Sequence, residues 1–236
     1  MRHSQSRFSE AWAHAEPIEG WLTRPQAEVL FESVQMLPPA STVVEIGSHR
    51  GRSTLVLAAA LPARGRLVAV DPFDAQWRYG GPDTQRALEE HLAAAGLADR
   101  VEVRATTSRA ARSTYTGPVD LLYIDGKHDY WTFRDDLLWA DLTPPGGTVL
   151  VHDAFSSVGV TLGLLRTLLV SPSLTYAGRT GSLARLRKGP PTMRARMRVI
   201  AQLPWCVRNL VVKVLLRLRL RSMARMVGHR GAADPF

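Results

Sequence analysis

The chain has 236 residues, of which 45% are hydrophobic, and this suits one α/β domain with appendages rather than two such domains. Its single cysteine, Cys206, excludes an internal disulfide framework and a thiolate metal cluster and fits a reducing cytoplasm. We expect neither a signal peptide nor a membrane span, because residues 1–16 lack an apolar core and no segment holds 18 uncharged apolar residues.

Charge is distributed unevenly along the chain. Residues 1–153 carry 15 Lys and Arg against 20 Asp and Glu, whereas residues 154–236 carry 15 against one acidic residue, Asp234. The first part is therefore −5 and the second +14, within a total of +9. A basic end of this kind is typical of contact with a polyanion or an anionic membrane surface.

The N-terminal part, residues 1–37, predicts a cap or lid segment that contains one helix. Thr23 is a suitable N-cap for a helix over residues 24–36. Trp12 and Trp21 have two alternative roles, a lid over the domain or a contact between copies in a homo-oligomer.

A glycine turn follows the first expected strand, residues 42–46. Gly47 and Gly51 let the main chain turn sharply, and a helix that starts at Ser53 offers unpaired N–H groups to a polar ligand. The next strand ends at Asp71, whose carboxylate reaches the same sheet edge in a right-handed β-α-β unit and can accept hydrogen bonds from two ribose hydroxyls. The first hypothesis is therefore a nucleoside-containing cofactor.

The remaining chain alternates helices with strands. The expected helices are residues 53–61, 83–95, 129–139 and 158–170, and the expected strands are residues 66–70, 101–104, 119–124, 148–151, 174–178 and 182–187. Gly181 lies between the last two strands and indicates a hairpin. Residues 38–188 thus predict a doubly wound, mostly parallel seven-stranded α/β sheet with one antiparallel strand.

Polar residues end four of the five strands that we expect to be parallel. They are Glu45, Asp71, Asp125 and the pair His152-Asp153. Because ligands bind at the carboxyl ends of the strands in open α/β sheets, we expect these residues to share one crevice.

The segments Glu45-Ile-Gly47, with Gly51, and Val68-Ala-Val-Asp71-Pro72-Phe73 resemble the class I S-adenosylmethionine-dependent methyltransferases. More narrowly, the chain is similar to the small-molecule O-methyltransferase-like group, which has an Asp-x-x-His motif after strand four, here Asp125-Gly126-Lys127-His128. That group has an acidic pair after strand five, and this chain departs from it with His152-Asp153. The resemblance implies a Rossmann-like methyltransferase fold with S-adenosyl-L-methionine as cofactor.

The cofactor site implied by this resemblance surrounds the glycine turn, with Asp71 on the ribose and Phe73 over the adenine. The predicted contacts are Glu45, Gly47, Ser48, Gly51, Ser53, Asp71, Pro72, Phe73, Thr107 and Asp125. Two of these residues have an alternative role without a cofactor. The alternative for Glu45 is a buried carboxylate that accepts hydrogen bonds from N–H groups of the turn. The alternative for Thr107 is a place in a capped helix start.

Asp125 and His128 are the predicted catalytic residues. Methyl transfer is an in-line displacement at a sulfonium, so the enzyme needs a positioned and partly deprotonated nucleophile. His128 lies one turn beyond Asp125, and an ordinary histidine pKa near 6.5 suits a general base. The alternative is a histidine that caps the next helix or only hydrogen-bonds the substrate.

Asp125, His152 and Asp153 are also a candidate metal site. A divalent ion there would bind a substrate hydroxyl and lower its pKa. His152 disfavours magnesium, because imidazole is a poor ligand for it, and leaves manganese, iron or no metal as the alternatives. Without a metal, His152 is a second base or a substrate contact.

Aromatic residues occupy the loops where an acceptor would enter. Trp77, Tyr79, Tyr130 and Trp131 either stack on a small-molecule or sugar-like hydroxyl acceptor or fill small cores of their own loops.

The tail, residues 189–236, predicts a basic amphipathic helix over residues 205–227. Lys213, Arg217, Arg221 and Arg225 recur every four residues. Apolar residues lie opposite them, namely Val211, Val212, Leu215, Leu216, Leu218, Met223 and Met226. Such a helix suits anionic lipid, so contact through residues 192–236 would hold the protein peripherally on the inner face of the membrane. The alternatives are packing on its own domain or on a second copy.

We do not expect nucleic-acid binding, because the tail has few aromatic residues apart from Trp205 and Phe236. The predicted function is a cytoplasmic S-adenosylmethionine-dependent O-methyltransferase. One alternative is a Rossmann-type oxidoreductase, which the missing Gly-x-Gly-x-x-Gly argues against. The other is a non-catalytic cofactor-binding module tethered to a membrane by the tail.

Overall fold

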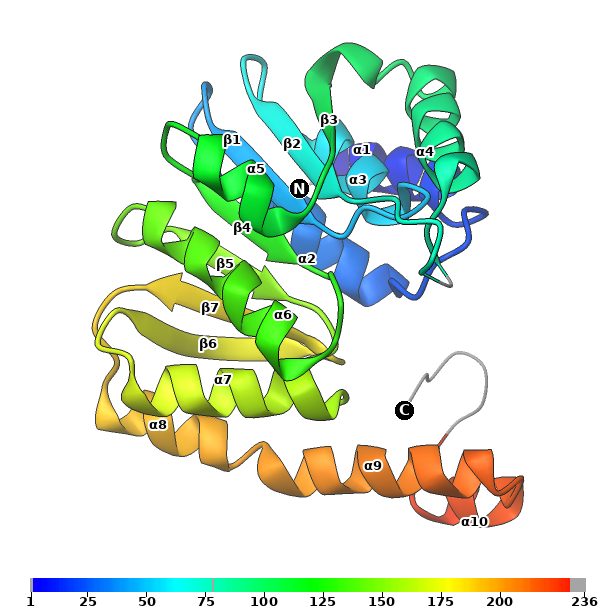
Figure 1. The fold of residues 1–236 in the computed structure, drawn as a ribbon, viewed down its shortest axis with the longest axis vertical. Coiled ribbons are helices and arrows are strands. Elements are labelled where there is room, and N and C mark those ends of the chain that lie inside the picture. The colour runs from blue at the N-terminus through cyan, green and yellow to red at the C-terminus, as the bar shows by residue number, and fades with distance from the viewer. Residues whose placement is uncertain (1, 78, 230–236) are drawn as a thin grey trace.

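The computed structural model describes residues 2–77 and 79–229, and Figure 1 shows a sheet with helices on both faces. Seven strands follow the order β3-β2-β1-β4-β5-β7-β6. Strands β1 to β5 run parallel, and β7 is antiparallel to both of its neighbours, β5 and β6. The prediction of a doubly wound sheet with one reversed strand is confirmed.

The elements alternate as expected. The strands are β1 (Thr42–Ile46), β2 (Arg66–Asp71), β3 (Val101–Ala105), β4 (Leu121–Ile124), β5 (Thr148–Val151), β6 (Leu174–Thr180) and β7 (Leu183–Lys188). The α-helices are α1 (Arg2–Ala15), α2 (Arg24–Gln35), α3 (Arg52–Ala60), α4 (Pro82–Ala94), α5 (Ser108–Thr114), α6 (Tyr130–Asp136), α7 (Val158–Val170), α8 (Met193–Ile200), α9 (Leu203–Arg217) and α10 (Arg221–Met226). Two 3-10 helices, η1 (Ala98–Arg100) and η2 (Leu137–Leu142), complete the set.

Each face of the sheet has its own hydrophobic core. Side chains of α1, α2, α3 and α4 fill one core, and side chains of α5, α6, α7 and the tail helices α8 and α9 fill the other. Strands β1 and β4 are buried along their whole length, because apolar side chains point into both cores. The two cores therefore fix the positions of β1 and β4, and with them the edge of the sheet where the carboxyl ends of these strands lie.

The N-terminal segment is a packed layer of the domain. Helix α1 packs on α3 and buries Phe8, Ala11 and Trp12. This helix was not predicted from the sequence. The guanidinium of Arg52 lies 5.1 Å from the Trp12 ring centre. Trp12 is thus a core residue, which corrects the expectation of a lid or a contact between copies. Trp21, by contrast, is 53% exposed.

The prediction of a single tail helix over residues 205–227 is wrong, because two helices, α9 and α10, occupy this segment. Helix α9 ends at Arg217, because Arg219 adopts a left-handed conformation with φ +61° and the N–H of Leu220 returns to the carbonyl of Leu215 at 2.8 Å. Helix α10 then folds back on α9 (Figure 1). The predicted basic stripe is therefore divided between two helices, and residues 230–236 of the tail lie outside the described residues.

One helical stretch in the described part of the chain, Met193–Arg217, is long and apolar enough to cross a bilayer by length and composition alone. The sequence shows no uncharged apolar run there, because Arg208 and Lys213 interrupt the apolar residues.

Gly47 provides a test of the turn that follows β1. It has φ +88°, and an added Cβ would lie 2.3 Å from the carbonyl oxygen of Asp125. Gly146 has a similar φ of +81° with nothing within 4 Å of an added Cβ. We predict that G146A loses about 1 kcal/mol from left-handed strain, and that G47A loses at least ~2 kcal/mol more from overlap. Urea unfolding of both variants measures the difference, and equal losses would contradict the close approach.

Candidate active site

The glycine turn joins β1 to α3 at the carboxyl edge of the sheet. Gly47, His49 and Gly51 all have positive φ, at +88°, +47° and +92°. The N–H of Gly47 donates to the carbonyl of Val70 on β2 at 2.9 Å. The turn is thus held to the neighbouring strand, and its two glycines permit close packing, because an added Cβ would overlap the carbonyl oxygen of Asp125 at Gly47 and the side chain of Leu88 at Gly51.

Glu45 lies beneath this turn and is fully buried. The hydroxyls of Ser53 and Thr54 each donate to one of its carboxylate oxygens at 2.5 Å. Burial outweighs these hydrogen bonds and raises the pKa of Glu45 from 4.5 to about 7. The hydroxyls of α3, rather than turn N–H groups, therefore satisfy this carboxylate, and direct contact of Glu45 or Ser53 with a cofactor stays a prediction.

Asp71 connects the glycine turn to the loop after β2. One of its carboxylate oxygens accepts from the N–H of His49 at 3.0 Å, and the other accepts from the N–H of Phe73 at 2.9 Å. Phe73 is buried with φ +45°, and Pro72 is exposed beside it. Asp71 thus stands next to the turn, as the ribose prediction requires.

Thr107 matches the alternative that the sequence left open. It is the N-cap of α5, and its hydroxyl accepts from the N–H of Ala110 at 3.3 Å. A contact between Thr107 and the adenine stays a prediction.

Asp125 follows β4 and touches the glycine turn through its backbone. Its N–H donates to the carbonyl of Ile46 at 2.8 Å, and the hydroxyl of Tyr123 donates to its carboxylate at 3.1 Å. His152 follows β5, and its N–H donates to the carbonyl of Ile124 at 2.9 Å. The ladder of parallel strands therefore brings the first, fourth and fifth strand ends together.

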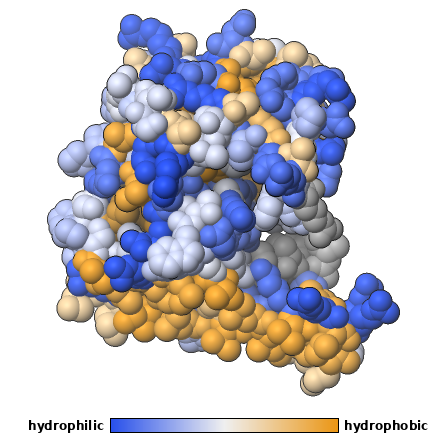
Figure 2. Space-filling model, viewed as in Figure 1, coloured by the Kyte–Doolittle hydropathy of each residue, from blue (hydrophilic) through white to orange (hydrophobic). Residues whose placement is uncertain are grey.

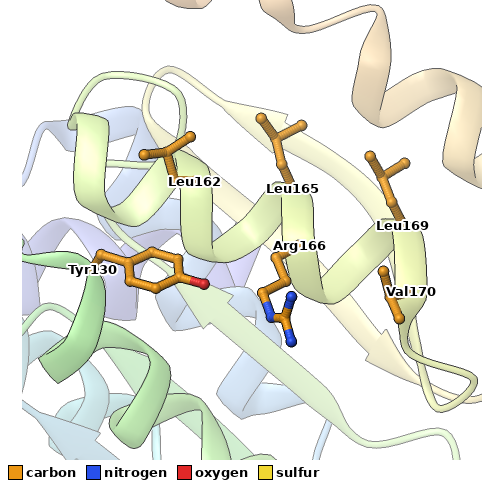
Figure 3. A pocket seen from close by; sticks show the side chains of 6 residues that line it. All are labelled: Tyr130, Leu162, Leu165, Arg166, Leu169 and Val170. Atoms are coloured by element: carbon orange, nitrogen blue, oxygen red, sulfur yellow. The ribbon is translucent and has the colours of Figure 1, made fainter.

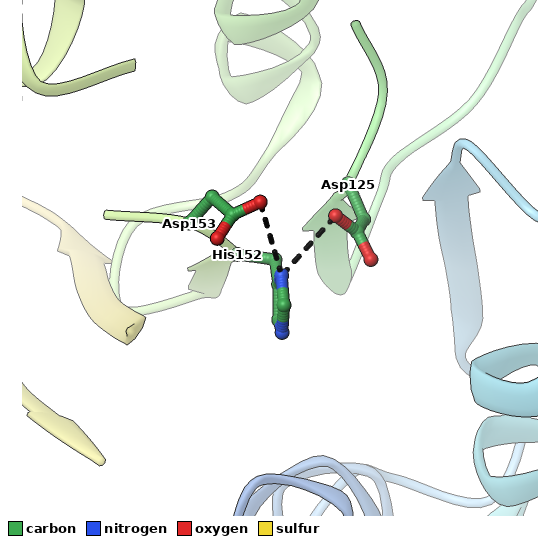
Figure 4. A group of neighbouring side chains, drawn as sticks. All are labelled: Asp125, His152 and Asp153. Carbon is green, nitrogen blue, oxygen red and sulfur yellow. Dashed lines mark ion pairs between the residues drawn. The ribbon is translucent and has the colours of Figure 1, made fainter. Parts of the chain in front are cut away.

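Two carboxylates and two imidazoles meet at this edge. His152 Nδ1 lies 3.3 Å from Asp125 Oδ1 and 3.8 Å from Asp153 Oδ2, the two ion pairs drawn in Figure 4. His128 Nε2 lies 3.2 Å from Asp153 Oδ2 and 3.7 Å from Asp125 Oδ1. The predicted catalytic and metal residues thus form one cluster.

The buried histidine of this cluster holds a proton. Burial alone would lower the pKa of His152, but Asp125 and Asp153 outweigh it and raise the pKa to about 10. Burial would raise the pKa of both carboxyl groups, and the histidines outweigh it in turn, so both pKa values are lowered. His152 is therefore an imidazolium at neutral pH, which argues against its role as a second base.

His128 is the accessible histidine, with 45% of its side chain exposed. Burial opposes its charge, but the neighbouring carboxylates of Asp125 and Asp153 outweigh that effect, so its pKa lies above 6.5. From the sequence we expected an ordinary pKa for His128. The neighbouring carboxylates instead make His128 a stronger base that is more often protonated at neutral pH.

Gln26 supports His152 from the other side and was missed as a site residue. Its Oε1 accepts from the N–H and hydroxyl of Thr23 at 2.9 Å each and lies 3.3 Å from His152 Nε2. Its amide donates to Ser182 at 3.0 Å. A glutamine three residues after a Thr cap is a local signal, but it indicates only helix capping.

The tail contacts the loop that carries Asp153. Asp153 and Phe155 have φ +53° and +58°, a strained conformation for non-glycine residues. The buried amide of Asn209 donates to the carbonyl of Phe155 at 3.2 Å, and Lys213 Nζ donates to the carbonyl of Ser156 at 2.6 Å. Lys213 therefore faces the domain, which the sequence pattern did not indicate.

The aromatic loop residues form two groups. Trp21 lies 4.9 Å from Tyr79 and 5.9 Å from the His49 ring in the glycine turn, and Trp77 lies 6.4 Å from Tyr79, all between ring centres. Tyr130 and Trp131 form a separate pair at 5.0 Å, and Trp131 is 74% exposed. The first group borders the glycine turn.

The sheet order, the glycine turn with Asp71 and the polar strand ends define a Rossmann-like nucleoside-binding domain. A family model described as a methyltransferase domain matches residues 44–154. Over these residues the chain is similar to methyltransferase domains, in agreement with its resemblance to the class I S-adenosylmethionine-dependent methyltransferases.

Known relatives of the chain are O-methyltransferases. The catechol O-methyltransferase of Niastella koreensis is 27% identical over 135 residues, covering 55% of this chain and 56% of its own. The flavonoid 3',5'-methyltransferase of Vitis vinifera is 30% identical over 116 residues, 48% of each chain. The chain thus spans about half the length of these relatives.

Solved structures share the fold. The O-methyltransferase TomG from Streptomyces achromogenes, solved in complex with S-adenosylmethionine, has a TM-score of 0.59 and 22% identity, and the match covers 78% of this chain and 89% of that one.

Glu45 makes stability depend on pH. The folded state retains a proton up to about pH 7 that the unfolded state releases near 4.5, so the free energy of unfolding falls as pH rises through this window. The shift corresponds to about 3 kcal/mol. We predict that E45Q loses less stability than the wild type between pH 5 and 8 in urea unfolding. E32Q, on the exposed side of α2, should keep the wild-type slope, and the same slope in E45Q would contradict this account.

Proposed function

We propose that the chain catalyses S-adenosylmethionine-dependent O-methylation of a small hydroxylated acceptor. The observation that carries this proposal is the contact between the glycine turn and the histidine cluster. Asp125 donates its N–H to Ile46, directly before the turn, and its carboxylate lies 3.7 Å from the imidazole of His128. A methyl donor at the turn and a base for the acceptor would thus be neighbours.

In this proposal the glycine turn binds the donor end of the reaction. The cofactor, when bound, supplies an electrophilic methyl group on a sulfonium. Gly47 and Gly51 let the turn pack closely against Asp125 and Leu88, and Asp71 can accept hydrogen bonds from the ribose of the cofactor while it stays bonded to His49 and Phe73. These contacts support the predicted cofactor site.

His128 receives the proton of the acceptor. As the acceptor oxygen forms its bond to the methyl carbon, the carbon–sulfur bond breaks and its electrons stay on sulfur, while the hydroxyl proton moves to His128. Asp125 and Asp153 stabilise the imidazolium that results, because both carboxylates lie within 4 Å of His128 Nε2. His152 keeps the two carboxylates in place.

Replacing His128 with Gln should lower kcat by about 10² to 10⁴, since a positioned base contributes this much, and should leave the dissociation constant for S-adenosylmethionine unchanged. In the wild type kcat should rise with pH through the pKa of His128, which lies above 6.5, and H128Q should lose this limb. H14Q, on the exposed side of α1, is the matched control. Full kcat in H128Q would eliminate His128 as the base.

The acceptor that we infer is an aromatic or sugar-like hydroxyl compound. Trp21 borders the turn beside Tyr79, and its 53% exposed ring suits stacking on a flat or ring-shaped acceptor. The names of the relatives specify catechol and flavonoid, and this favours a phenolic hydroxyl.

A divalent cation is a further part of the proposal. Asp125, His152 and Asp153 each offer one ligand atom, all within 4.8 Å of one another. Two carboxylates and one imidazole suit manganese better than magnesium. The cation would lower the pKa of an acceptor hydroxyl, and His152 would have to release its Nδ1 proton to bind it.

Mn²⁺ should therefore raise the melting temperature of the wild type but not of D153N, and EDTA should abolish both this shift and methyl transfer. D141N, which removes an exposed carboxylate far from the cluster, should behave like the wild type. Calorimetric melting curves and turnover assays measure both effects. Activity that survives EDTA, with no shift in melting temperature, would remove the cation and leave the histidines to act alone.

We also keep the cytoplasm as the proposed location and a homo-oligomer as a proposed state. Among the described residues, no contact favours the oxidoreductase or a non-catalytic role over methyl transfer.

A further inference from the structure

The outer side of the tail helices is an exposed apolar face. Its members recur at intervals of three or four residues within α8 and again along α9 to its C-cap, and they are Met197, Ile200, Val207, Val211, Val214 and Leu218. Val207, Val214 and Leu218 are each more than half exposed, at 58%, 56% and 62%. Figure 2 shows this apolar band along the lower edge of the molecule, where Figure 1 places α7 and α9. We call these six residues the apolar face.

The opposite side of α9 is attached to the domain. Cys206, Asn209 and Val212 are buried, and Asn209 and Lys213 donate to the carbonyls of Phe155 and Ser156. These contacts fix the orientation of α9. Its apolar side is therefore directed outward by the fold and is not a disordered extension.

Helix α7 extends the exposed apolar surface. Leu162 and Val170 are 51% and 70% exposed, and they line a shallow groove with Leu165, Leu169, Arg166 and Tyr130. Figure 3 shows Leu162, Leu165 and Leu169 projecting from the same side of α7, away from Tyr130. The apolar surface thus spans more than one helix, which exceeds what isolated surface residues produce.

The charge around the apolar face has one sign. Residues 154–229 contain no Asp or Glu, while Arg217, Arg219, Arg221 and Arg225 gather at the end of α9 and on α10. All four are exposed, and none forms an ion pair with another described residue. An apolar surface beside an uncompensated cationic cluster complements a surface that is itself apolar and anionic.

We propose that the apolar face docks on an anionic membrane surface, with α8 and α9 lying parallel to the bilayer plane. The apolar side chains enter the headgroup boundary, and the arginines of α10 contact the anionic headgroups. This docking is independent of the methyl-transfer proposal, because none of its residues belongs to the cluster around His128.

Two other occupants fit less well. A spanning helix would have to withdraw Asn209 and Lys213 from the loop at residues 155–156 and leave a buried face unpacked. A second copy docked symmetrically through the same face would bring two cationic clusters together without acidic partners, because residues 154–229 contain no Asp or Glu. The fixed inner face and the charge therefore favour peripheral contact with lipid.

Flotation of the full chain with vesicles tests the proposal. We expect binding to phosphatidylcholine with 30% phosphatidylglycerol, release by 1 M NaCl, and at least tenfold weaker binding to phosphatidylcholine alone. The double variant V207S/V214S should weaken binding about tenfold without changing net charge. R217Q/R221Q/R225Q should weaken it about 100-fold, at about fivefold for each cation near the surface.

M36S is the matched control, because Met36 is 74% exposed at the end of α2, outside the apolar face. It should bind like the wild type, and circular dichroism should show that every variant is folded. Equal binding of all variants would overturn the proposal. So would resistance to salt and carbonate extraction, which indicates a spanning helix, or a dimer in light scattering that V207S/V214S dissociates.

Discussion

The backbone contact between Gly47 and Asp125 is the constraint on which the rest of this structure depends. An added Cβ at Gly47 would lie 2.3 Å from the carbonyl oxygen of Asp125, so the ends of β1 and β4 approach each other only because this position is glycine. The approach unites the turn that suits a methyl donor with the carboxylate that anchors the histidine cluster. A larger residue would separate the two halves of the proposed reaction.

The second constraint is charge balance at the same edge. Asp125 and Asp153 could not both ionise in a buried site without cations, and His152 supplies one as an imidazolium with a pKa of about 10. The side-chain oxygen of Gln26 lies beside the other ring nitrogen of His152, Nε2, and accepts its hydrogen bond. Asn209 of the tail holds the strained loop beside Asp153. The N-terminal helices and the tail, which look like appendages in the sequence, therefore both support the site.

Local patterns predicted most of the fold. The strands at residues 42–46 and 148–151 and the helix at residues 158–170 agree with the structure to the residue, because apolar runs mark all three and glycines flank the two strands. The break between α9 and α10 was missed because Arg219 adopts a left-handed conformation that no glycine marks. The strand-end carboxylates could be grouped from topology alone. The contact of His152 with Gln26 could not, since 126 residues separate them and their spacing carries no signal.

The central claim is that the turn at residues 47–51 and Asp71 bind a methyl donor rather than a dinucleotide. Isothermal titration of the full chain with S-adenosylmethionine, and separately with NAD, tests it most directly. The account predicts saturable binding of S-adenosylmethionine that D71N weakens, and no heat with NAD. Tight NAD binding together with no response to S-adenosylmethionine would contradict it.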